Sequence, residues 1–308
     1  MLYSFDKESS MGISRRNILS MIGSAPLLSL PSIAAATHSR RHTKVAYFTD
    51  LHLAASNEIN LRAQKAFKKA HENDLFLFGG DNLMAVDHQP EDQVLAQFDN
   101  WNRFTANHLT KPHRSILGNH DIENGSPADG THLCGKRRTM ELYNMKDRYW
   151  VDHIGGWRII GLDTVQKIRD SYHGHVDTAQ LKWLEGVLAA DRHTPTMVLG
   201  HIPLLSVTPM ADYNVKSQPM SMPVSYCSHV RNARTIIKMF RQAGNIKLCM
   251  SGHTHMNDRC EFGGTTYVCA GAVSGSWWNG NHQGFAPSFT QINLMTDGDF
   301  DLKTVHFE

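Results

Sequence analysis

The sequence of 308 residues has almost no excess of charge of either sign and only five cysteines. Its 31 basic and 29 acidic residues leave a formal net charge of +2. A nucleic-acid-binding protein usually presents a concentrated basic surface, so we expect no nucleic-acid partner. Apolar residues make up 41% of the chain, which is enough for one large domain or at most two small ones.

The few cysteines also lack the spacing of a metal-binding motif. No CxxC pair or zinc-finger pattern occurs. The odd count leaves at least one thiol free or paired between chains, and the sequence assigns no disulfide connectivity. Cys249 and Cys269 lie in apolar, strand-like runs, which favours buried structural thiols. The five cysteines are Cys134, Cys227, Cys249, Cys260 and Cys269.

A long uninterrupted hydrophobic run is missing too. The apolar stretch over residues 18–36 contains Ser, Gly and Pro, which makes it a poor membrane span. Arg15 and Arg16 precede this stretch, and it ends in three alanines, as a small-residue cleavage site does. These features are similar to a twin-arginine export signal, with an ordinary Sec signal as the alternative. We therefore predict an export signal over 1–36 that the twin-arginine machinery reads, a linker over 37–43 and a periplasmic or secreted domain without a permanent membrane anchor.

The rest of the chain alternates short apolar runs with helical segments, which indicates an α/β architecture. An Asp177–Gln180 pattern resembles a capping box at the start of a helix. An irregular segment at about 203–228 predicts a lid-like insertion, with a surface insertion as the alternative. We expect buried strands at 45–48, 75–78, 115–117, 197–199 and 246–250, a hairpin over 149–162, and helices at 60–71, 91–109, 178–188 and 230–242.

Five of the apolar runs end in side chains that can bind a metal ion. In open α/β sheets ligands bind outside the carboxyl ends of the strands, so these residues should converge. On an extended backbone, residues i and i+2 point the same way, so a D-x-H or H-x-H pair can supply two ligands to one site. In chain order, the residues are Asp50 and His52, Asp81 and Asn82, Asn119 with His120 and Asp121, His201, and finally His253 and His255.

Together the five motifs resemble the calcineurin-like metallophosphoesterase family, whose pattern runs D-x-H, G-D, G-N-H-D or E, G-H and G-H-x-H. The resemblance covers residues 44–308 and implies a single domain with a four-layer α/β/β/α sandwich and a site for two metal ions. It implies that Asp81 bridges the two ions. One ion would be held by Asp50, His52, Asp81 and His255, and the other by Asp81, Asn119, His201 and His253.

The ligand types fit this chemistry. Carboxylate, imidazole and amide groups suit two divalent ions such as Mn, Fe or Zn. A hydroxide that bridges two such ions can attack phosphorus in line. In the family pattern His120 is not a ligand, and we expect it to assist the leaving oxygen while Asp121 orients it. Met84 stands where purple acid phosphatases carry a tyrosine, so no purple iron site is expected.

The motif spacing is most similar to bacterial class III cyclic-nucleotide phosphodiesterases and glycerophosphodiesterases. This likeness implies hydrolysis of small-molecule phosphodiesters, extending to monoesters in many relatives. Trp277 and Trp278 lie in a loop rich in Gly and Ser, and either lines the pocket or fills the core. We predict Trp278 and Asn82 as the substrate-binding residues. Two alternatives belong to other classes: a catalytically inactive metal-binding module, and a metal hydrolase of a non-phosphate substrate.

The chain has 19 histidines, and most are expected on the surface. His173 and His175 imitate a ligand pair, but they lie in a polar segment and are predicted to be surface residues. His113 and His153 are expected to be structural or exposed. The sequence leaves the oligomeric state open.

Overall fold

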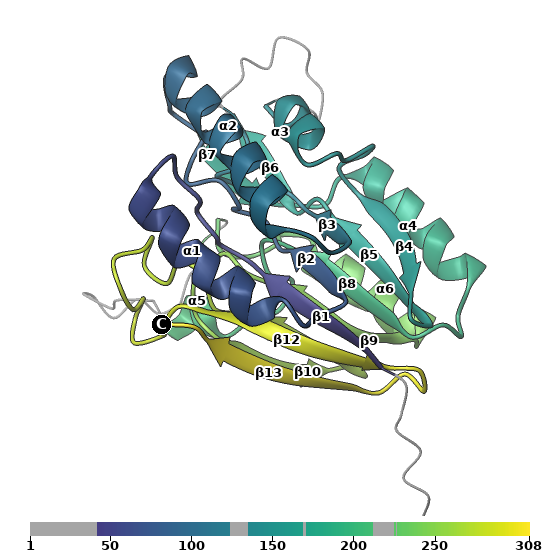
Figure 1. Cartoon of the computed structure of the whole chain (residues 1–308). Helices are drawn as coiled ribbons and strands as arrows, with labels where there is room; N and C mark the ends of the chain where they lie inside the picture. Colours follow the sequence, from purple (N-terminus) through teal and green to yellow (C-terminus); the bar gives the residue numbers. More distant parts are fainter. Residues whose placement is uncertain (1–41, 124–134, 169–170, 212–224, 226) are drawn as a thin grey trace, which may run out of the picture. The chain divides into compact units, whose positions relative to one another are not determined.

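Two β-sheets pack face to face, and helices cover the outer side of each sheet (Figure 1). The computed structural model describes residues 42–123, 135–168, 171–211, 225 and 227–308. These residues fall within one compact unit, Arg40–Glu308. The predicted export signal, and the greater part of the predicted lid at 203–228, lie outside the described residues.

The first sheet has five strands in the order β13-β12-β1-β2-β3. Strands β1, β2 and β3 are parallel, whereas β12 pairs antiparallel with both β1 and β13. The strands are β1 (His42–Phe48), β2 (Leu75–Phe78), β3 (His113–Ser115), β12 (Ser288–Met295) and β13 (Phe300–His306).

The second sheet has six strands in the order β10-β11-β9-β8-β5-β4, and its four central strands are parallel. A separate antiparallel pair is formed by β6 (Val165–Ile168) and β7 (Ser171–Gly174). The six strands are β4 (Trp150–Ile154), β5 (Trp157–Leu162), β8 (Thr196–Gly200), β9 (Ile246–Ser251), β10 (Asp258–Phe262) and β11 (Thr265–Cys269).

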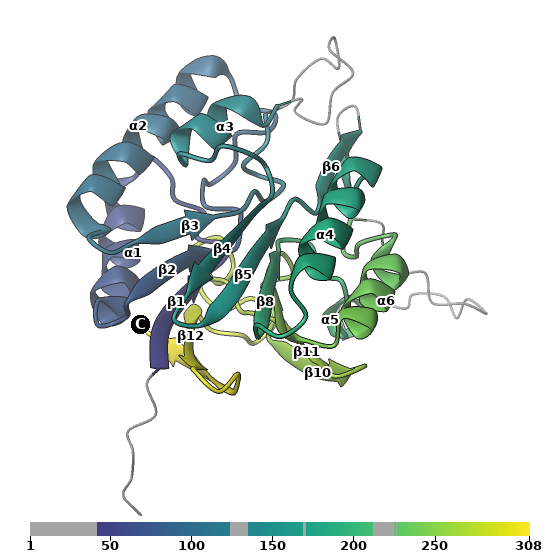
Figure 2. The ribbon, with the colours of Figure 1, turned by 90° about the vertical axis from the view of Figure 1, so that its right-hand side faces the viewer.

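Helices α1 (Asn57–Ala70) and α2 (Glu91–His108) cover the first sheet, and α4 (Thr178–Ala190) and α6 (Ala233–Ala243) cover the second (Figure 2). Two short helices are α3 (Arg137–Leu142) and α5 (Thr208–Ala211). Asp177 caps α4 as predicted, accepting hydrogen bonds from the backbone N–H groups of Ala179 and Gln180. The reciprocal bond of a capping box is replaced, because the Gln180 side chain bonds the backbone of Asp163 instead.

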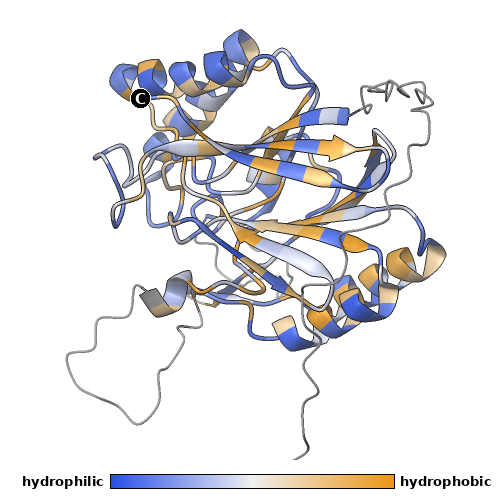
Figure 3. Cartoon of the chain, turned by 90° about the horizontal axis from the view of Figure 1, so that it is seen from below, coloured by the Kyte–Doolittle hydropathy of each residue, from blue (hydrophilic) through white to orange (hydrophobic). Residues whose placement is uncertain are grey.

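Side-chain alternation along the strands creates three apolar layers. In β1, Val45 and Tyr47 face the core between the two sheets, whereas Ala46 and Phe48 face α1 and α2. The period of two in an extended strand produces this division. The third layer lies between the second sheet and α4 and α6, and hydrophobic residues recur along the strands of both sheets (Figure 3). Three apolar layers require four layers of secondary structure, which confirms the predicted α/β/β/α fold class.

A buried ion-pair network closes the carboxyl end of β5. The Asp163 carboxylate lies 2.6 Å from Lys136 Nζ and 2.9 Å from Arg148 Nη1. Arg148 Nη2 lies 2.5 Å from Asp177 Oδ2, at the start of α4. Asp163 is therefore a structural residue, although it follows a parallel strand as the candidate metal ligands do.

Cys249 and Cys269 are buried as predicted, and burial raises the pKa of each thiol to about 12. Cys227 and Cys260 are also free thiols, while Cys134 lies outside the described residues. None of the described helices combines the length and the hydrophobicity that crossing a bilayer requires.

Candidate metal centre

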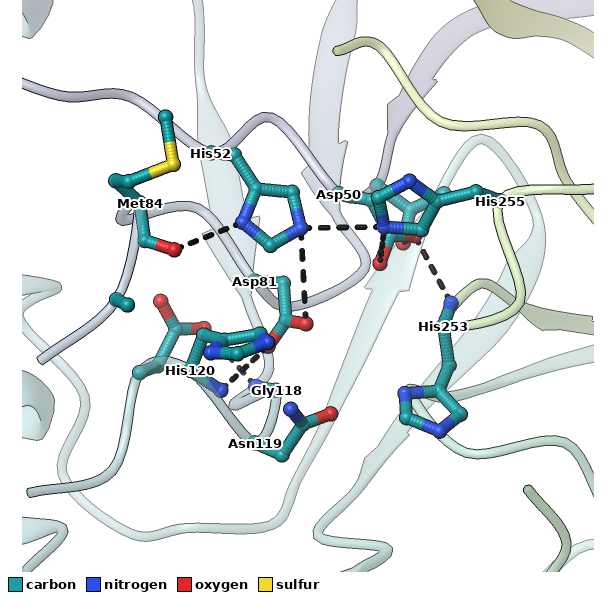
Figure 4. Close-up of polar contacts among 12 residues, drawn as sticks. Asp50, His52, Asp81, Met84, Gly118, Asn119, His120, His253 and His255 are labelled. Atoms are coloured by element: carbon teal, nitrogen blue, oxygen red, sulfur yellow. Dashed lines mark hydrogen bonds and ion pairs between the residues drawn. The ribbon is translucent and has the colours of Figure 1, made fainter. Parts of the chain in front are cut away.

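The carboxyl ends of five parallel strands supply all seven residues predicted as metal ligands. Strands β1, β2 and β3 belong to the first sheet, and β8 and β9 to the second. Figure 4 shows the side chains of Asp50, His52, Asp81, Asn119, His253 and His255 gathered at this point. The loops are Asp50–His52 after β1, Asp81 after β2, Asn119 after β3, His201 after β8, and His253–His255 after β9.

The ligand atoms form two adjacent groups. Asp50, His52 and His255 make one group, and Asp81, His201 and His253 make the other; within each, the candidate ligand atoms lie within 4.8 Å of one another. Asp81 connects the groups, since its Oδ2 is 3.2 Å from His201 Nε2 and 3.9 Å from His52 Nε2. In addition, Asn119 Oδ1 lies 3.2 Å from His201 Nε2. This arrangement has the form of a dinuclear centre with one shared carboxylate.

Three of the imidazoles are oriented by backbone carbonyl groups. The Nδ1 atoms of His52, His201 and His255 lie 3.0, 2.9 and 2.5 Å from the carbonyl oxygens of Met84, Gly79 and Gly275. Donation of Nδ1–H to a carbonyl fixes the tautomer and leaves the Nε2 lone pair for a metal ion. The Nε2 atoms of His52 and His255 are only 3.2 Å apart and belong to the same group of candidate ligand atoms.

The buried charges fit a cation at each position. Asp50 Oδ2 accepts hydrogen bonds from Thr49 Oγ1 and from the His253 N–H, but the buried Oδ1 has no hydrogen-bond partner among the described residues and faces His255 Nε2 at 3.4 Å. Burial lowers the pKa of His52 to about 3 and that of His253 to about 4, so both rings are neutral donors. A pair of divalent cations would satisfy these donors together.

The pKa shifts of Asp50, Asp81 and His201 also indicate a site that favours positive charge. Burial alone would raise the pKa of Asp81, but the neighbouring His201 holds it well below its usual range. Asp50 behaves likewise beside His255. Burial would lower the pKa of His201, yet Asp81 raises it to about 9. A positive charge is thus favoured next to Asp81.

Backbone geometry at these loops departs from the expected extended form. Asp50, His52, Asp81, His253 and His255 all have positive φ, between 46° and 76°. Residues i and i+2 do converge on the centre, but the extended backbone that we predicted as the cause is wrong. His253 and His255 belong to different ligand groups. Left-handed backbone costs about 1–2 kcal/mol per non-glycine residue, and such strain gathers at functional sites.

Glycines precede the ligands because the loops pack against one another. A side chain at Gly118 would collide with the Asp81 carboxylate. One at Gly252 would collide with Thr49 and with the Asp50 carboxylate. The glycine in the G-N-H-D and G-H-x-H motifs is therefore needed for close approach of the backbone to the neighbouring ligand.

Comparison with known proteins agrees with this geometry. A family model described as calcineurin-like phosphoesterase matches residues 43–257. The chain belongs to the calcineurin-like phosphoesterases. The family assignment confirms the resemblance predicted from the five motifs, and it indicates a metal-dependent hydrolase of phosphoesters. A comparison with curated proteins gives no match.

Solved structures of this phosphoesterase fold show how far sequences diverge on it. A dimetal phosphatase from Danio rerio is 12% identical, with 86% of this chain and 99% of that chain covered and a TM-score of 0.55. GAP50, the anchor in the inner membrane complex of Plasmodium, is 14% identical, with 87% and 85% covered and a TM-score of 0.53. At these identities the likeness establishes the fold alone.

In this phosphoesterase, His120 has a different partner from the one predicted. Its Nδ1 lies 2.9 Å from Asp87 Oδ1, whereas we expected Asp121 to orient the ring. Burial would lower the pKa of His120, but Asp81 and Asp87 raise it to about 9. The Asp121 carboxylate instead accepts hydrogen bonds from the backbone N–H groups at residues 82, 83 and 118 and from the Tyr143 hydroxyl. Asp121 therefore links the loops that follow β2 and β3. Asp87 is the carboxylate that orients the His120 ring.

The substrate-binding predictions are also corrected. Trp278 is only 5% exposed, packs in the core beside α1 and donates its indole N–H to the His52 carbonyl at 2.9 Å. Trp277 is 39% exposed, and its ring centroid lies 4.4 Å from that of His255. Asn82 is fully buried, so it cannot contact a substrate in this conformation. Trp277 is the tryptophan that lines the site.

A cavity of about 220 Å³ lies over the two ligand groups. Asp81, Asn119, His253 and His255 contribute from the centre, and no lysine or arginine is among the described residues that line it. The non-ligand residues of the lining are His120, Tyr172, Pro209, Ser228, Thr254, Met256, Trp277 and His282. A larger groove of about 1140 Å³ begins near Leu109 and contains none of the predicted site residues.

Four histidines that were not predicted as ligands or catalytic residues differ in solvent exposure. His113 and His153 are exposed, in agreement with the prediction. His173 is not a surface residue, because it belongs to β7 and is 8% exposed. His175 is half-buried. Asp87 was missed, since it lies in a loop without periodicity or motif, and its contact with His120 forms only when that loop folds back.

Proposed function

We propose that this protein is an exported dinuclear-metal phosphoesterase that hydrolyses phosphodiester bonds of small molecules. The observation that carries this proposal is the pair of ligand groups connected by Asp81, at the floor of a cavity that His120 also lines. The site brings together four imidazoles, two carboxylates and an amide oxygen, and glycines allow the loops that carry them to pack closely.

The preference for diesters is supported by the charges that line the cavity. A phosphodiester carries one negative charge, whereas a monoester carries close to two at neutral pH. Apart from the two divalent cations and His120, whose pKa Asp81 and Asp87 raise to about 9, the described lining adds no lysine or arginine that would favour the second charge of a monoester. A neutral second ester group could instead rest against Trp277, whose ring is partly exposed at the cavity wall.

The chain's own residues would position the reactants. When bound, two divalent cations neutralise phosphoryl charge and make a water molecule nucleophilic near neutral pH. Asp50, His52 and His255 would hold one cation and Asn119, His201 and His253 the other, with Asp81 between them. His120 lines the cavity with its Nδ1 held by Asp87, so its Nε2 is available to give a proton to the departing ester oxygen.

The proposed cellular location rests on the sequence features at residues 1–36. An apolar stretch behind paired arginines supports export by the twin-arginine machinery, and hence a periplasmic or secreted enzyme. Fusion of residues 1–36 to a reporter that is active only after export tests this part separately. Substitution of Arg15 and Arg16 by lysine should abolish reporter activity, whereas retained activity would favour the Sec route.

The activity is tested with purified, metal-quantified enzyme. We expect cleavage of bis-p-nitrophenyl phosphate with added Mn(II) or Zn(II), and a higher kcat/KM for this diester than for p-nitrophenyl phosphate. Asp81→Ala should lose both the bound metal and the activity, while Asp301→Ala, at an exposed position on β13, should retain both. Equal rates for wild type and Asp81→Ala would contradict the shared carboxylate.

Two results would favour the alternatives. Stoichiometric metal without turnover of any diester or monoester in a substrate panel would indicate a binding or scaffolding module; the similar fold of GAP50, described as an anchor, gives that outcome a precedent in structure. Turnover that inorganic phosphate does not inhibit would indicate a hydrolase of a non-phosphate substrate.

A further inference from the structure

The β6–β7 pair stands apart from both sheets of the sandwich but contributes directly to the cavity. Tyr172 of β7 lines the cavity together with Asp81, Asn119 and His120. Its ring meets that of His253 edge-on, with centroids 5.8 Å apart and an interplanar angle of 86°. The motif pattern gives no role to this tyrosine, since it lies in none of the five strand-end loops.

The Tyr172 hydroxyl is available for a ligand. Among the described residues, no hydrogen-bond partner is assigned to this hydroxyl, although the residue is half-buried at the cavity wall. A phenol remains protonated at neutral pH, with an ordinary pKa near 10, and is therefore a hydrogen-bond donor. Neutral donors of this kind can stabilise charge that develops on an oxyanion without adding a fixed positive charge.

The opposite strand ties this face of the pair to the His120 environment. Lys167 on β6 is the cross-strand partner of Tyr172, and residues directly opposite one another project to the same face. Lys167 Nζ lies 3.9 Å from Asp87 Oδ2, while Asp87 Oδ1 contacts His120. One face of the pair thus reaches His253 through Tyr172 and reaches His120 through Lys167 and Asp87.

The base of the pair is held firmly, as a catalytic position requires. Gly174 forms a parallel bridge with Val230, and its carbonyl accepts a hydrogen bond from the Arg231 N–H at 2.8 Å. The Tyr172 carbonyl accepts a hydrogen bond from Cys227 Sγ at 3.2 Å. The backbone of Tyr172 is therefore held by Cys227, and its ring packs edge-on against His253.

We propose that Tyr172 is a further catalytic residue of the phosphoesterase, donating its hydroxyl hydrogen bond to a non-bridging phosphoryl oxygen of the substrate. This assignment rests on the phosphoesterase function proposed above. Tyr172 makes and breaks no covalent bond, and its proton stays on the phenol oxygen throughout. Its part is to stabilise the negative charge that shifts onto the phosphoryl oxygens as the ester bond breaks.

The test compares Tyr172→Phe with wild type and with Tyr149→Phe, a matched control in the larger groove away from the ligands. The first variant keeps the ring against His253 and removes only the hydroxyl. We expect kcat/KM for bis-p-nitrophenyl phosphate to fall about 100-fold, the scale on which loss of one oxyanion donor acts. Inhibition by vanadate should weaken as well, while elemental analysis finds the wild-type metal content. Tyr149→Phe should match wild type.

Each other outcome has a separate meaning. If wild type is active and Tyr172→Phe is equally active, the role of Tyr172 is refuted and the phosphoesterase function stands. Loss of metal from Tyr172→Phe would also refute it, because the hydroxyl would then act only through His253. If metal-loaded wild type hydrolyses no phosphoester, the proposed function fails, and the assignment of Tyr172 fails with it.

Discussion

Replacing Asp121 with alanine removes the acceptor of four hydrogen bonds that join the loops after β2 and β3. Its Oδ1 accepts from the N–H groups of Asn82 and Leu83 at 3.0 and 3.1 Å and from the Tyr143 hydroxyl at 2.7 Å. Its Oδ2 accepts from the Gly118 N–H at 2.9 Å. These loops carry Asp81 and Asn119, so the substitution affects the metal ligands indirectly.

The expected cost follows from the burial of these groups. Asp121 is fully buried, and each donor left without an acceptor costs about 1–3 kcal/mol. Water that enters the vacated space will satisfy part of this loss, so we expect about 3–5 kcal/mol of lost stability in total. For a domain of this size, about 2–4 °C of Tm is lost per kcal/mol, which gives a decrease of roughly 10 °C.

Urea and thermal denaturation of metal-free protein measure this change, and elemental analysis measures metal retention after dialysis. Asp121→Ala should be less stable and should also lose metal more readily than wild type. Asp121→Asn should lie between the two, because its amide keeps one acceptor oxygen but places an NH₂ group against one set of donors. A variant with wild-type stability and metal content but low kcat would restore Asp121 to the role of orienting His120.

Three further predictions concern residues around the site and in the core. Asp87→Ala should lower kcat about 10- to 100-fold, since the Nδ1 atom of His120 loses the Asp87 carboxylate, and should leave the metal content unchanged; metal loss would contradict the positioning role. Asp163→Ala removes the carboxylate partner of buried Lys136 and one partner of Arg148, which keeps Asp177, and should cost about 3–5 kcal/mol in urea denaturation. Glu261→Ala, at an exposed ion pair, should change stability by less than about 0.5 kcal/mol. Trp278→Ala should cost about 3–5 kcal/mol, while Trp277→Ala should raise KM for aromatic diesters with little change in Tm; the reverse pattern would restore the sequence-based choice.

The candidate ligands could be predicted from the sequence because each follows a strand. Strand ends are set by local chemistry, namely a short apolar run that stops at glycine or a polar residue, and parallel strands place those ends together. Strands β1, β2, β8 and β9 contain the predicted runs, although β3 ends at Ser115, before the predicted boundary at 117. The convergence of the loops followed from topology alone and needed no knowledge of their backbone angles.

The partners of those ligands could not be predicted in the same way. Asp87 reaches His120 because its loop folds back, with the Val86 N–H bonded to the His120 carbonyl at 2.9 Å. Such a contact joins positions 33 residues apart and leaves no periodic signal between them. Similarly, Trp277 and Trp278 both have positive φ, so a tight turn rather than composition decides which ring enters the core.

The polar β6–β7 pair was missed for a different reason. Its strands have four residues each and lack the apolar alternation by which strands are recognised in a sequence. His173 was therefore assigned to a surface loop. The same shortness explains why no sequence pattern points to Tyr172, although it lines the cavity.

The two ligand groups draw residues from both halves of the sandwich, and this has a consequence for how the protein would lose its structure. Asp50, His52, Asp81 and Asn119 follow strands of the first sheet, whereas His201, His253 and His255 follow strands of the second. His52 and His255 are 203 residues apart, so the ligand set is complete only when the two sheets are docked. Bound cations would act as cross-links between the sheets and add about 4 kcal/mol at a thousandfold excess over their Kd. Chelation should therefore speed hydrogen exchange first at the carboxyl ends of β1 and β9, while the helices on the outer faces stay protected.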